Sequence, residues 1–492
     1  MQEFRPSMSA SPPVIVWFRE DLRTTDNPAL AAAVETGAPV LCVFIRETGV
    51  KDARPMGGAS LWWLDKSLKA LEASLTAAGG HLVLRTGHPR QVLLDLIAET
   101  GARTVVWNRR YSEPEKTVDA EIKSELKAAG IEALSYNARL LMEPWQLKTG
   151  SGGYYRVFTP FWRALQANYA PAKALAAPKK LAGVAAPTEI LADWRLHPLK
   201  PDWSGGLGEA WTPGEAGAAA RLKAFLNGPV SGYADRRNRP DLDDSTSGLS
   251  PHLRFGEIGP AQIWRAVKAG IEAGRINERS GMIFLSEIAW REFSYVLLNF
   301  NPALAEKNYN PCFDNMPWRR DKASLIAWQR GQTGYPIVDA GMRQLWHTGW
   351  MHNRVRMIVA SFLTKHLLLP WQAGEGWFWD TLVDADPAAN AASWQWTAGS
   401  GADAAPYFRV FNPITQGSKF DETGGYVRRW VPELKKMPDK YLHAPFEAPE
   451  DVLKAAGVVL GKTYPKPVVD HSAARQRALD AYKQTRQEQD AG

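Results

Sequence analysis

The chain has 492 residues, which is long enough for about three domains and for a large buried core. Its 59 Lys and Arg exceed its 52 Asp and Glu, and the net charge of +7 with a pI near 9.2 is compatible with a polyanionic partner. Only Cys42 and Cys312 are present, far apart and in apolar surroundings, which argues against a disulfide framework or a thiolate metal site.

Residues 1–13 lack the continuous apolar segment of a signal peptide, and no later stretch approaches about 18 uninterrupted apolar residues. We therefore expect a soluble, cytoplasmic protein without membrane contact, and a monomer. The 21 Trp residues are an excess that needs a reason, because an indole ring must pack well and find a partner for its N–H.

Short apolar runs alternate with helical patterns from residue 14 to residue 139. The runs VIVWF, PVLCVFI, HLVLR, TVVWN and IEALSY are typical of strands, and helical patterns lie near residues 59–78, 89–100 and 114–129. A cap signal, Asp26-Asn27-Pro28, begins a further helix after the first run. The alternation predicts an α/β domain with a doubly wound parallel sheet. Because Arg19–Arg23 follow the first run in place of a glycine-rich turn, a Rossmann-type dinucleotide site is not expected.

The rest of the chain is predicted to be a connection followed by a largely helical domain. Residues 170–217 are rich in Pro, Ala and Gly with little periodicity, so residues 140–217 are assigned to the connection. Helical patterns such as GMIFLSEIAWREFSYVLL dominate residues 218–470. Residues 471–492 are polar and charged, and we expect one solvated helix or a frayed tail there.

The stretch 334–396 has a composition unlike an ordinary core. We expect Gly349 to interrupt a helix that restarts at Trp350, and Pro370 to end it at Trp371. One face of this helix mixes aromatic, amide, cationic and thioether groups on Trp350, Asn353, Arg354, Met357 and Ser361. Hydrogen-bonding side chains then precede two indoles, in the order Asp384, Asp386, Asn390, Trp394 and Trp396. The mixture favours a bound planar cofactor, and the alternative is a core of tryptophans with structural ion pairs.

Two loops carry candidate anion-binding groups. Residues 245–251, STSGLSP, form a hydroxyl-rich turn whose neutral donors suit a pyrophosphate, although such clusters also mark plain loops and helix caps. Residues 233–240 join Tyr233 to a short basic cluster that suits the phosphates of a nucleic acid strand. A solvated loop is the rival interpretation of the basic cluster.

One predicted helix brings a carboxyl, a guanidinium and an indole together. Phe284, Glu287 and Arg291 share a face at i, i+3 and i+7, with Trp290 beside them. The simplest alternative is an ion pair between Glu287 and Arg291 on the helix surface. The functional interpretation makes Glu287 a hydrogen-bond or proton donor.

Taken in order, the motifs of this chain resemble those of the photolyase and cryptochrome family. The matching segments are VIVWFREDLR, NPALAAAV, YRVFTPFWRA, TSGLSPHLRFGEI, SEIAWREF, GYPIVDAGMRQL, TGWMHNRVRM, DADPAAN, SWQW, DAAPYFRVFNP and QGSKFD. Within the family, Asn353 and Arg354 make the chain more similar to bacterial cyclobutane pyrimidine dimer photolyases than to (6-4) photolyases. The resemblance implies an α/β antenna domain joined by a long linker to an all-helical domain that binds FAD.

By this resemblance, the helical domain holds FAD in a folded conformation. The positions that match residues around its phosphates, sugar and rings are Tyr233, Thr246, Ser247, Gly248, Leu249, Ser250, Phe284, Arg291 and Trp350. Arg356 and Asp384 match an ion pair beside the flavin, and Asp386 matches a partner of its polar edge. Asn390 matches the residue facing flavin N5, where a neutral amide can accept from N5–H.

The resemblance also implies an electron relay and a lesion pocket. Trp394, Trp371 and Trp318 match a chain of indoles from the flavin to the surface, and Trp328 is a rival member. The positions that match DNA contacts and the pocket for a flipped dimer are Arg237, Glu287, Trp290, Asn353, Arg354, Met357 and Trp396. Flipping favours damaged DNA, because a dimer already stacks and pairs poorly.

The antenna site departs from the folate pattern of the family at one position. Glu115 matches the folate-contacting carboxylate, but Pro114 replaces the neighbouring Asn. Residues 57–63, GGASLWW, resemble the variant found in class III photolyases and plant cryptochromes. We expect methenyltetrahydrofolate as the antenna, with a deazaflavin as the alternative.

The implied activity is light-driven repair of cyclobutane pyrimidine dimers in UV-damaged DNA. One electron passes from excited, reduced FAD to the dimer, the C5–C5 and C6–C6 bonds open, and the electron returns. Glu287 is expected to stabilise the dimer radical anion, because a carboxyl aimed at a pyrimidine carbonyl acts where charge develops. The alternatives are a cryptochrome-type light sensor and a flavoprotein whose helical domain merely binds DNA.

Overall fold

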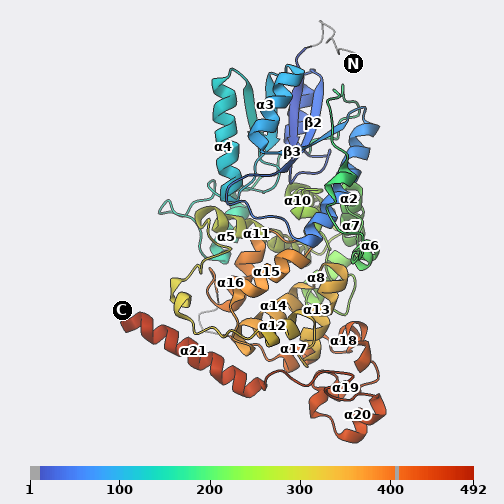
Figure 1. The fold of residues 1–492 in the computed structure, drawn as a ribbon, viewed down its shortest axis with the longest axis vertical. Coiled ribbons are helices and arrows are strands. Elements are labelled where there is room, and N and C mark those ends of the chain that lie inside the picture. The colour runs from blue at the N-terminus through green and yellow to red at the C-terminus, as the bar shows by residue number, and fades with distance from the viewer. Residues whose placement is uncertain (1–10, 405–408, 492) are drawn as a thin grey trace.

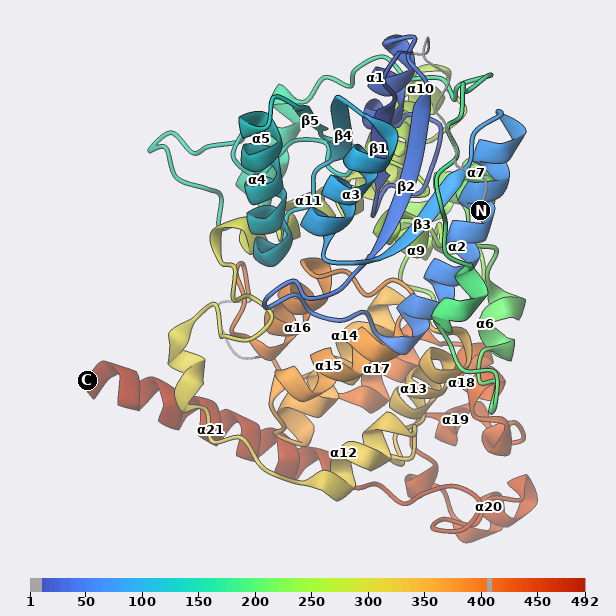
Figure 2. The ribbon, with the colours of Figure 1, turned by 45° about the horizontal axis from the view of Figure 1, so that its top comes forward.

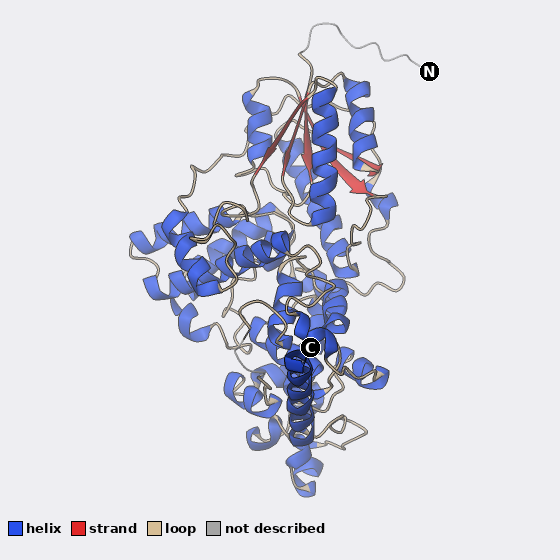
Figure 3. Cartoon of the chain, turned by 90° about the vertical axis from the view of Figure 1, so that its left-hand side faces the viewer, coloured by secondary structure: helices blue, strands red, loops and turns tan. Residues whose placement is uncertain are grey.

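The N-terminal half is an α/β unit with one parallel sheet. The computed structural model describes residues 11–404 and 409–491, so residues 1–10 and part of the motif DAAPYFRVFNP lie outside the described residues. The strand order is β3-β2-β1-β4-β5, and β1 pairs with both β2 and β4, so the sheet is doubly wound as predicted. The sheet has five strands, and Figure 3 shows it in red between helices. The strands are β1 (Val14–Phe18), β2 (Val40–Glu47), β3 (Leu82–Gly87), β4 (Thr104–Asn108) and β5 (Glu132–Tyr136).

Alternate residues of the strands fill two separate cores, one on each face of the sheet. Val14, Val16 and Phe18 of β1 pack with the first two helices, whereas Ile15 and Trp17 pack with the next two. Burial on both faces explains why these strands are continuous apolar runs. The helices are α1 (Pro28–Glu35), α2 (Gly58–Ala77), α3 (Pro89–Thr100) and α4 (Glu113–Ala128).

The predicted cap of α1 is present. Asn27 occupies the N-cap position, and its side chain accepts a hydrogen bond of 3.1 Å from the backbone N–H of Leu30. Pro28 is the first helical residue, where its missing N–H costs nothing.

The connection is mostly irregular and packs back on the α/β unit. It contains α5 (Phe158–Asn168), a 3-10 turn at Leu191–Trp194 and α6 (Gly205–Ala210). Val40 of β2 bridges to Gly183, which ties this segment to the sheet. The boundary expected between residues 217 and 218 stays a prediction, and that position lies near the start of α7 (Glu215–Leu226).

The second unit is helical, and no strand follows β5 in the described part of the chain. Figure 1 shows it below the α/β unit, with residue numbers rising towards the C-terminal helix. Its longer helices are α10 (Pro260–Glu272), α11 (Glu278–Phe300), α13 (Pro336–Thr348), α14 (Asn353–Ser361), α15 (Trp371–Thr381), α16 (Ala389–Ala398) and α21 (His471–Ala491). Its shorter helices are α8 (Tyr233–Arg236), α9 (Ser250–Arg254), α12 (Lys322–Gln329), α17 (Pro413–Phe420), α18 (Gly425–Trp430), α19 (Asp439–Leu442) and α20 (Glu450–Ala456).

Two predicted helix boundaries are wrong. Gly349 ends α13 in the left-handed conformation at φ 65°, as expected, but α14 begins only at Asn353. His352 is its N-cap and accepts from the backbone N–H of Arg354, so Trp350 lies in the connection and not on the face of α14. Trp371 begins α15 rather than ending the previous helix, because Pro370 in an extended conformation serves as its N-cap.

The C-terminal segment is a helix with one buried face. Ala478 and Ala481 of α21 pack against Cys312, Phe313 and Leu368. Of the expected solvated helix or frayed tail, the described residues form one helix, and the correction is that one of its faces is buried. No described helix combines the length and the apolar character needed to cross a membrane.

Candidate functional site

The predicted cofactor residues come together where α11 and α14 pack against α16. The hydroxyl-rich turn before α9 joins them through Trp350, whose Nε1 donates to Ser250 Oγ at 3.2 Å. The guanidinium of Arg356 lies 5.9 Å from the centre of the Trp350 ring. Trp350 therefore links the turn to α14, although it does not belong to that helix.

The hydroxyl-rich turn has a tight backbone. Gly248 is in the left-handed region at φ 62°, and a Cβ there would lie 2.7 Å from Nη1 of Arg221. Leu249 is buried, and its N–H donates to Ser247 Oγ at 3.3 Å, while Thr246 and Ser247 are half-buried. The turn thus leaves the Thr246 and Ser247 hydroxyls partly exposed, and its backbone at position 248 favours glycine.

Arg356 and Asp384 form the predicted ion pair. Arg356 Nη2 lies 2.8 Å from Asp384 Oδ2, and its Nε donates to the carbonyl of Met351 at 2.7 Å. The other oxygen, Asp384 Oδ1, is buried and has no hydrogen-bond partner among the described residues. A ligand donor is the natural partner for this acceptor, because a buried oxygen without one is costly.

Asp386 has partners within the protein for both of its oxygens. Oδ1 accepts from the backbone N–H groups of Ala388 and Ala389 at 2.9 Å, and Oδ2 accepts from the Tyr295 hydroxyl at 2.7 Å. Asp386 therefore holds the start of α16, and its contact with the polar edge of a cofactor stays a prediction. Tyr295 is missed by the sequence reasoning, because its position on α11 marks it only as a buried aromatic.

Tyr233 and Phe284, two of the predicted cofactor residues, pack against each other in the hydrophobic core. Their rings lie 5.4 Å apart and edge to face, and both rings contact Phe225. Burial raises the pKa of the Tyr233 hydroxyl, so that it stays protonated. The ordinary core interpretation accounts for their packing.

The alternative of a Glu287–Arg291 ion pair is wrong. Glu287 pairs instead with Arg237, and both side chains are 28% exposed. Arg291 turns to Glu292 at 3.2 Å and donates to the carbonyl of Arg139 at 2.8 Å, which leaves its Nη2 buried without a partner among the described residues. Burial raises the pKa of the Glu287 carboxyl although the Arg237 charge opposes this shift.

The predicted lesion-pocket residues lie on the same three helices and remain accessible. Trp290 of α11 stacks on Phe158 with ring centroids 3.7 Å apart, and Trp396 of α16 donates to the carbonyl of Asp403 at 3.1 Å. Met357 is half-buried and Asn353 is exposed. Phe158 covers one face of Trp290 and Phe293 meets the ring edge to face, and the sequence alone could not indicate these contacts.

Arg354 lies beside the pocket on α14. Its Nη2 donates to Asn238 Oδ1 at 2.9 Å, and its guanidinium lies 4.4 Å from the centre of the Phe420 ring. Burial and the nearby Arg237 lower the pKa of Arg354. Arg237 and Arg354 are therefore close enough for their charges to interact, and their contact with DNA phosphates stays a prediction.

The three indoles of the predicted relay occupy a deep core and its margin. Trp371 is 0% exposed and donates from Nε1 to Asn308 Oδ1 at 2.8 Å, and Trp394 is 2% exposed. Trp318 is half-buried in a separate small cluster beside α21. The rival Trp328 packs 6.1 Å from Trp394 but is 0% exposed, so it offers no surface end.

The predicted antenna residue, Glu115, lies at the carboxyl edge of the sheet, in the first turn of the helix that follows β4. Glu115 is in the first turn of α4, and its Oε2 is buried without a partner among the described residues. Burial raises the pKa of Glu115, and the charge of Arg110 opposes the shift. Ligands commonly bind at this edge of open α/β sheets.

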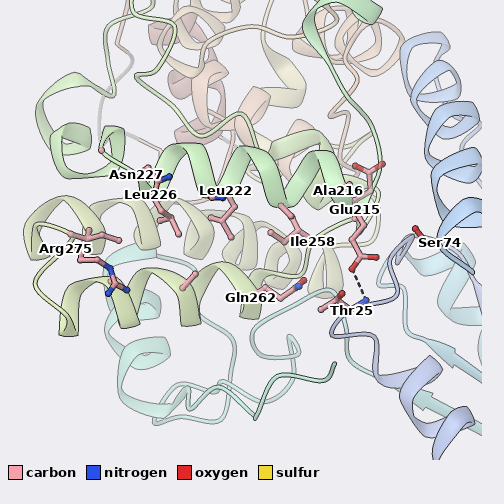
Figure 4. Close-up of a pocket in the computed structure, with 17 residues that line it drawn as sticks. Thr25, Ser74, Glu215, Ala216, Leu222, Leu226, Asn227, Ile258, Gln262 and Arg275 are labelled. Carbon is pink, nitrogen blue, oxygen red and sulfur yellow. Dashed lines mark hydrogen bonds between the residues drawn. The ribbon is translucent and has the colours of Figure 1, made fainter. Parts of the chain in front are cut away.

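A groove of about 900 Å³ lies elsewhere, between α7 and α10. Figure 4 shows Leu222 and Leu226 facing Ile258 across it, with Glu215 accepting from Thr25 at one end. None of the predicted site residues lines this groove, so it is not the candidate site.

The family is shown by comparison with known proteins. Residues 14–179 match the DNA photolyase family, and residues 284–484 match the FAD binding domain of DNA photolyase. The fold and the site thus define a flavoprotein with an α/β unit and an FAD-binding helical unit, as predicted. The chain belongs to the photolyase and cryptochrome family.

Three relatives place it within that family. The chain is 57% identical to a deoxyribodipyrimidine photo-lyase of Agrobacterium fabrum over 96% of this chain and 97% of the relative. It is 40% identical to Cryptochrome-1 of Arabidopsis thaliana over 96% of this chain and 70% of that protein. The crystal structure of a bacterial class III photolyase from Agrobacterium tumefaciens superimposes with a TM-score of 0.94 at 55% identity, covering 99% of this chain and 100% of the other.

The chemistry of the site fits FAD. Several segments that carry predicted site residues also hold buried polar atoms without a partner among the described residues, namely Asp384 Oδ1, Arg291 Nη2, His352 Nε2 and Ser245 Oγ. A ligand that combines a heteroaromatic ring, hydroxyl groups and a pyrophosphate can satisfy groups of both kinds.

Proposed function

We propose that this protein is a light-driven repair enzyme that splits cyclobutane pyrimidine dimers in DNA. The observation that carries the proposal is the placement of Glu287 and Trp290 on α11. Both side chains are half-buried, both lie on the helix that packs against the Asn390 helix, and the pKa of the Glu287 carboxyl is raised. An aromatic face and a hydrogen-bonding carboxyl next to a flavin pocket suit a flipped dimer of two adjacent pyrimidines.

The roles of the residues follow from their chemistry. FAD, when bound, supplies light-driven one-electron reduction. Trp290 and Trp396 provide the apolar walls of the lesion pocket, Glu287 donates a hydrogen bond to a pyrimidine carbonyl, and Arg237 neutralises a DNA phosphate. Opening the C5–C5 and C6–C6 bonds of the dimer leaves no net redox change, because the electron returns after the bonds break.

Asn390 is assigned to flavin N5 and the Arg356–Asp384 pair to the neighbouring polar atoms. Asn390 is a neutral amide, so it can accept from N5–H without placing a negative charge beside a cofactor that must hold an anion. The unpartnered Oδ1 of Asp384 supports this placement.

The decisive experiment illuminates a thymine-dimer oligonucleotide with the chemically reduced protein and follows the recovery of thymine absorbance. We expect light-dependent recovery and none in the dark. If the FAD is demonstrably reduced and no dimer is split, the repair function is wrong, and a cryptochrome-type light sensor takes its place.

The relay from Trp394 through Trp371 to Trp318 is tested separately from repair. Trp318 is the half-buried member, so Trp318→Phe should slow photoreduction of oxidised flavin by removing the surface end. Repair by chemically reduced protein should be nearly unchanged. Equal photoreduction in parent and variant would remove Trp318 from the relay, and Trp328→Phe serves as the comparison for the rival route.

For the antenna, we propose methenyltetrahydrofolate bound near Glu115, with a deazaflavin as the alternative. The unpartnered, buried Glu115 Oε2 supports a ligand that donates a hydrogen bond. Chromatography of the chromophores released on denaturation identifies the ligand directly. We also propose that the protein acts on UV-damaged DNA as a monomer in the cytoplasm, where the buried thiols of Cys42 and Cys312 stay reduced.

A further inference from the structure

The amide of Asn390 is held by a residue that no motif indicated. Asn390 Nδ2 donates to the side-chain oxygen Oε1 of Glu375 at 2.8 Å and to the backbone carbonyl of Glu375 at 3.1 Å. Glu375 lies on α15, and it is 3% exposed. A carboxylate buried to this degree needs a charged partner, because an unpaired buried charge costs several kcal/mol.

That partner comes from the other half of the molecule. Arg54 lies in the loop between β2 and α2, and its guanidinium bonds both oxygens of Glu375, at 2.7 and 2.8 Å. The bidentate geometry is the strong form of an Arg–carboxylate contact. Figure 2 shows the loop after β2 crossing from the α/β unit onto α15 and α16.

The loop is fixed to α15 by several further contacts. The Arg54 guanidinium lies 4.1 Å from the centre of the Trp379 ring, and Trp379 Nε1 donates to the carbonyl of Pro55 at 2.8 Å. A Cβ at Gly57 would lie 2.2 Å from the carbonyl oxygen of Trp379, so only glycine allows this approach. The contacts place Arg54 in one position relative to Glu375.

The contacts also decide which end of the Asn390 amide faces the cofactor site. Both groups that meet its Nδ2 end are acceptors, so the opposite orientation would bring two oxygens against the amide oxygen. No described residue donates to Asn390 Oδ1. The acceptor end of the amide is therefore the end that faces away from Glu375.

We propose that Arg54 is a positioning residue for the flavin: through Glu375 it fixes the Asn390 amide with its oxygen towards N5, and it cancels the Glu375 charge. This inference rests on the proposed function, in which Asn390 faces flavin N5. An oxygen fixed there accepts from N5–H and favours the reduced cofactor. A neutral Arg54–Glu375 pair leaves the anionic reduced form without a repelling neighbour.

Charge variants of the two partners must shift the flavin potential in opposite directions. Arg54→Gln leaves the Glu375 carboxylate without its cation, which disfavours the anionic reduced flavin. Glu375→Gln keeps an acceptor for Asn390 and leaves the Arg54 cation, which favours it. At a fixed potential, the ratio of fully reduced to one-electron-oxidised flavin should fall about tenfold in Arg54→Gln and rise about tenfold in Glu375→Gln. Each change corresponds to a shift of about 59 mV in the one-electron potential.

The experiment is a spectroelectrochemical titration of the flavin in the purified holoprotein. The Arg54→Gln potential should fall, the Glu375→Gln potential should rise, and the double variant should return close to the parent. Arg265→Gln is the matched control, because Arg265 pairs across the same two halves with Asp26 and bonds none of the predicted flavin residues. Its potential should equal that of the parent.

Shifts in the same direction for both variants, or no shift in either, would overturn the proposal. If Arg54→Gln loses its flavin, the test depends on Glu375→Gln alone, because the proposal requires the flavin potential of that variant to rise. Dimer splitting by the parent is measured in parallel. A parent that splits dimers while the variants keep its potential would refute only the role of Arg54, whereas a parent that binds FAD without splitting dimers refutes the repair function.

Discussion

At the residue scale, the ion pairs of the site differ from those that helix spacing suggests. Glu287 pairs with Arg237 rather than with Arg291, although the i, i+4 spacing suggested the nearer arginine. Arg291 is drawn to Glu292 and to the carbonyl of Arg139. Sequence spacing identifies which side chains share a helix face, but the choice among partners depends on burial and on other elements.

Trp290→Ala should weaken binding of dimer-containing DNA by about 1–3 kcal/mol, the value of one lost base–aromatic stack. Phe158 stacks on one face of this half-buried indole, and the proposed function places the lesion on the other face. Equilibrium binding at fixed salt measures the effect, and Trp346→Ala, at a side chain 62% exposed on α13, is the control. Equal losses in both variants would show a general effect of removing tryptophan.

Arg237→Gln should move the pH dependence of repair to higher pH. Burial already holds the Glu287 pKa above its ordinary value, and the Arg237 charge works against that shift. Without the arginine the pKa rises further, so the carboxyl keeps its proton, and its donor capacity, to higher pH. The measurement is the yield of splitting per absorbed photon against pH, at saturating DNA.

The control for Arg237→Gln is Arg236→Gln, since Arg236 pairs with the exposed Asp244 and not with Glu287. The role given to Glu287 would be contradicted if the pH at which the yield of splitting falls were unchanged in the Arg237 variant, or if it moved to a lower value.

At the scale of elements, the strands and the first helices were predictable, because strands buried on both sheet faces have continuous apolar sequences. The end of the helix that follows α13 was not predictable. Pro370 was expected to end one helix, yet it begins α15, and its effect depends on whether the chain arrives extended. The packing of α21 by Ala478 and Ala481 was also hidden, because two small apolar residues do not mark a buried face in a polar sequence.

The packing of α15 on α16 should be sensitive at Gly374 and not at Gly376. A Cβ at Gly374 would lie 2.1 Å from Cη2 of Trp394, whereas a Cβ at Gly376 meets nothing within 4 Å. Gly374→Ala should destabilise the protein by about 1–3 kcal/mol through overpacking and slow flavin photoreduction by displacing Trp394. Gly376→Ala should stabilise it by about 0.5–1 kcal/mol through helix propensity.

Urea unfolding and transient absorption after a light flash measure the two effects. Because both substitutions add one methyl group to the same helix, the difference between them isolates the contact with Trp394. Equal stability of the two variants would mean that α15 can shift to accommodate the methyl group.

At the scale of the whole molecule, an α/β unit and a helical unit were predictable, but the way they meet was not. Arg54, Glu20 and Arg139 carry no recognisable interface pattern in the sequence. Arg139 lies 2.7 Å from Glu20 and donates to the Tyr295 hydroxyl at 2.7 Å, and that hydroxyl donates to Asp386. The interface between the halves therefore reaches the candidate site, which no local pattern could reveal.

The carboxylate of Glu20 should make the stability of this interface depend on pH. Burial alone would raise its pKa, but the charges of Arg139 and Arg254 outweigh burial and hold it at about 2, against 4.5 ordinarily. A depressed carboxyl pKa contributes stability that is complete above pH 4.5 and is lost as the pH falls towards 2. The contribution is about 3 kcal/mol.

Glu20→Gln should therefore lower the free energy of unfolding by about 3 kcal/mol at neutral pH, since it leaves Arg139 and Arg254 without their anion. The difference from the parent should narrow as the pH falls from 4.5 towards 2, because the unfolded parent binds a proton at Glu20 in this range while the folded parent still holds the carboxylate. Urea unfolding between pH 7 and pH 3 measures the two curves, with Glu209→Gln, at a side chain 79% exposed, as the control. If the difference between parent and Glu20→Gln stays constant over this range, the Glu20 charge does not hold the two halves together, and the loss must be assigned to packing.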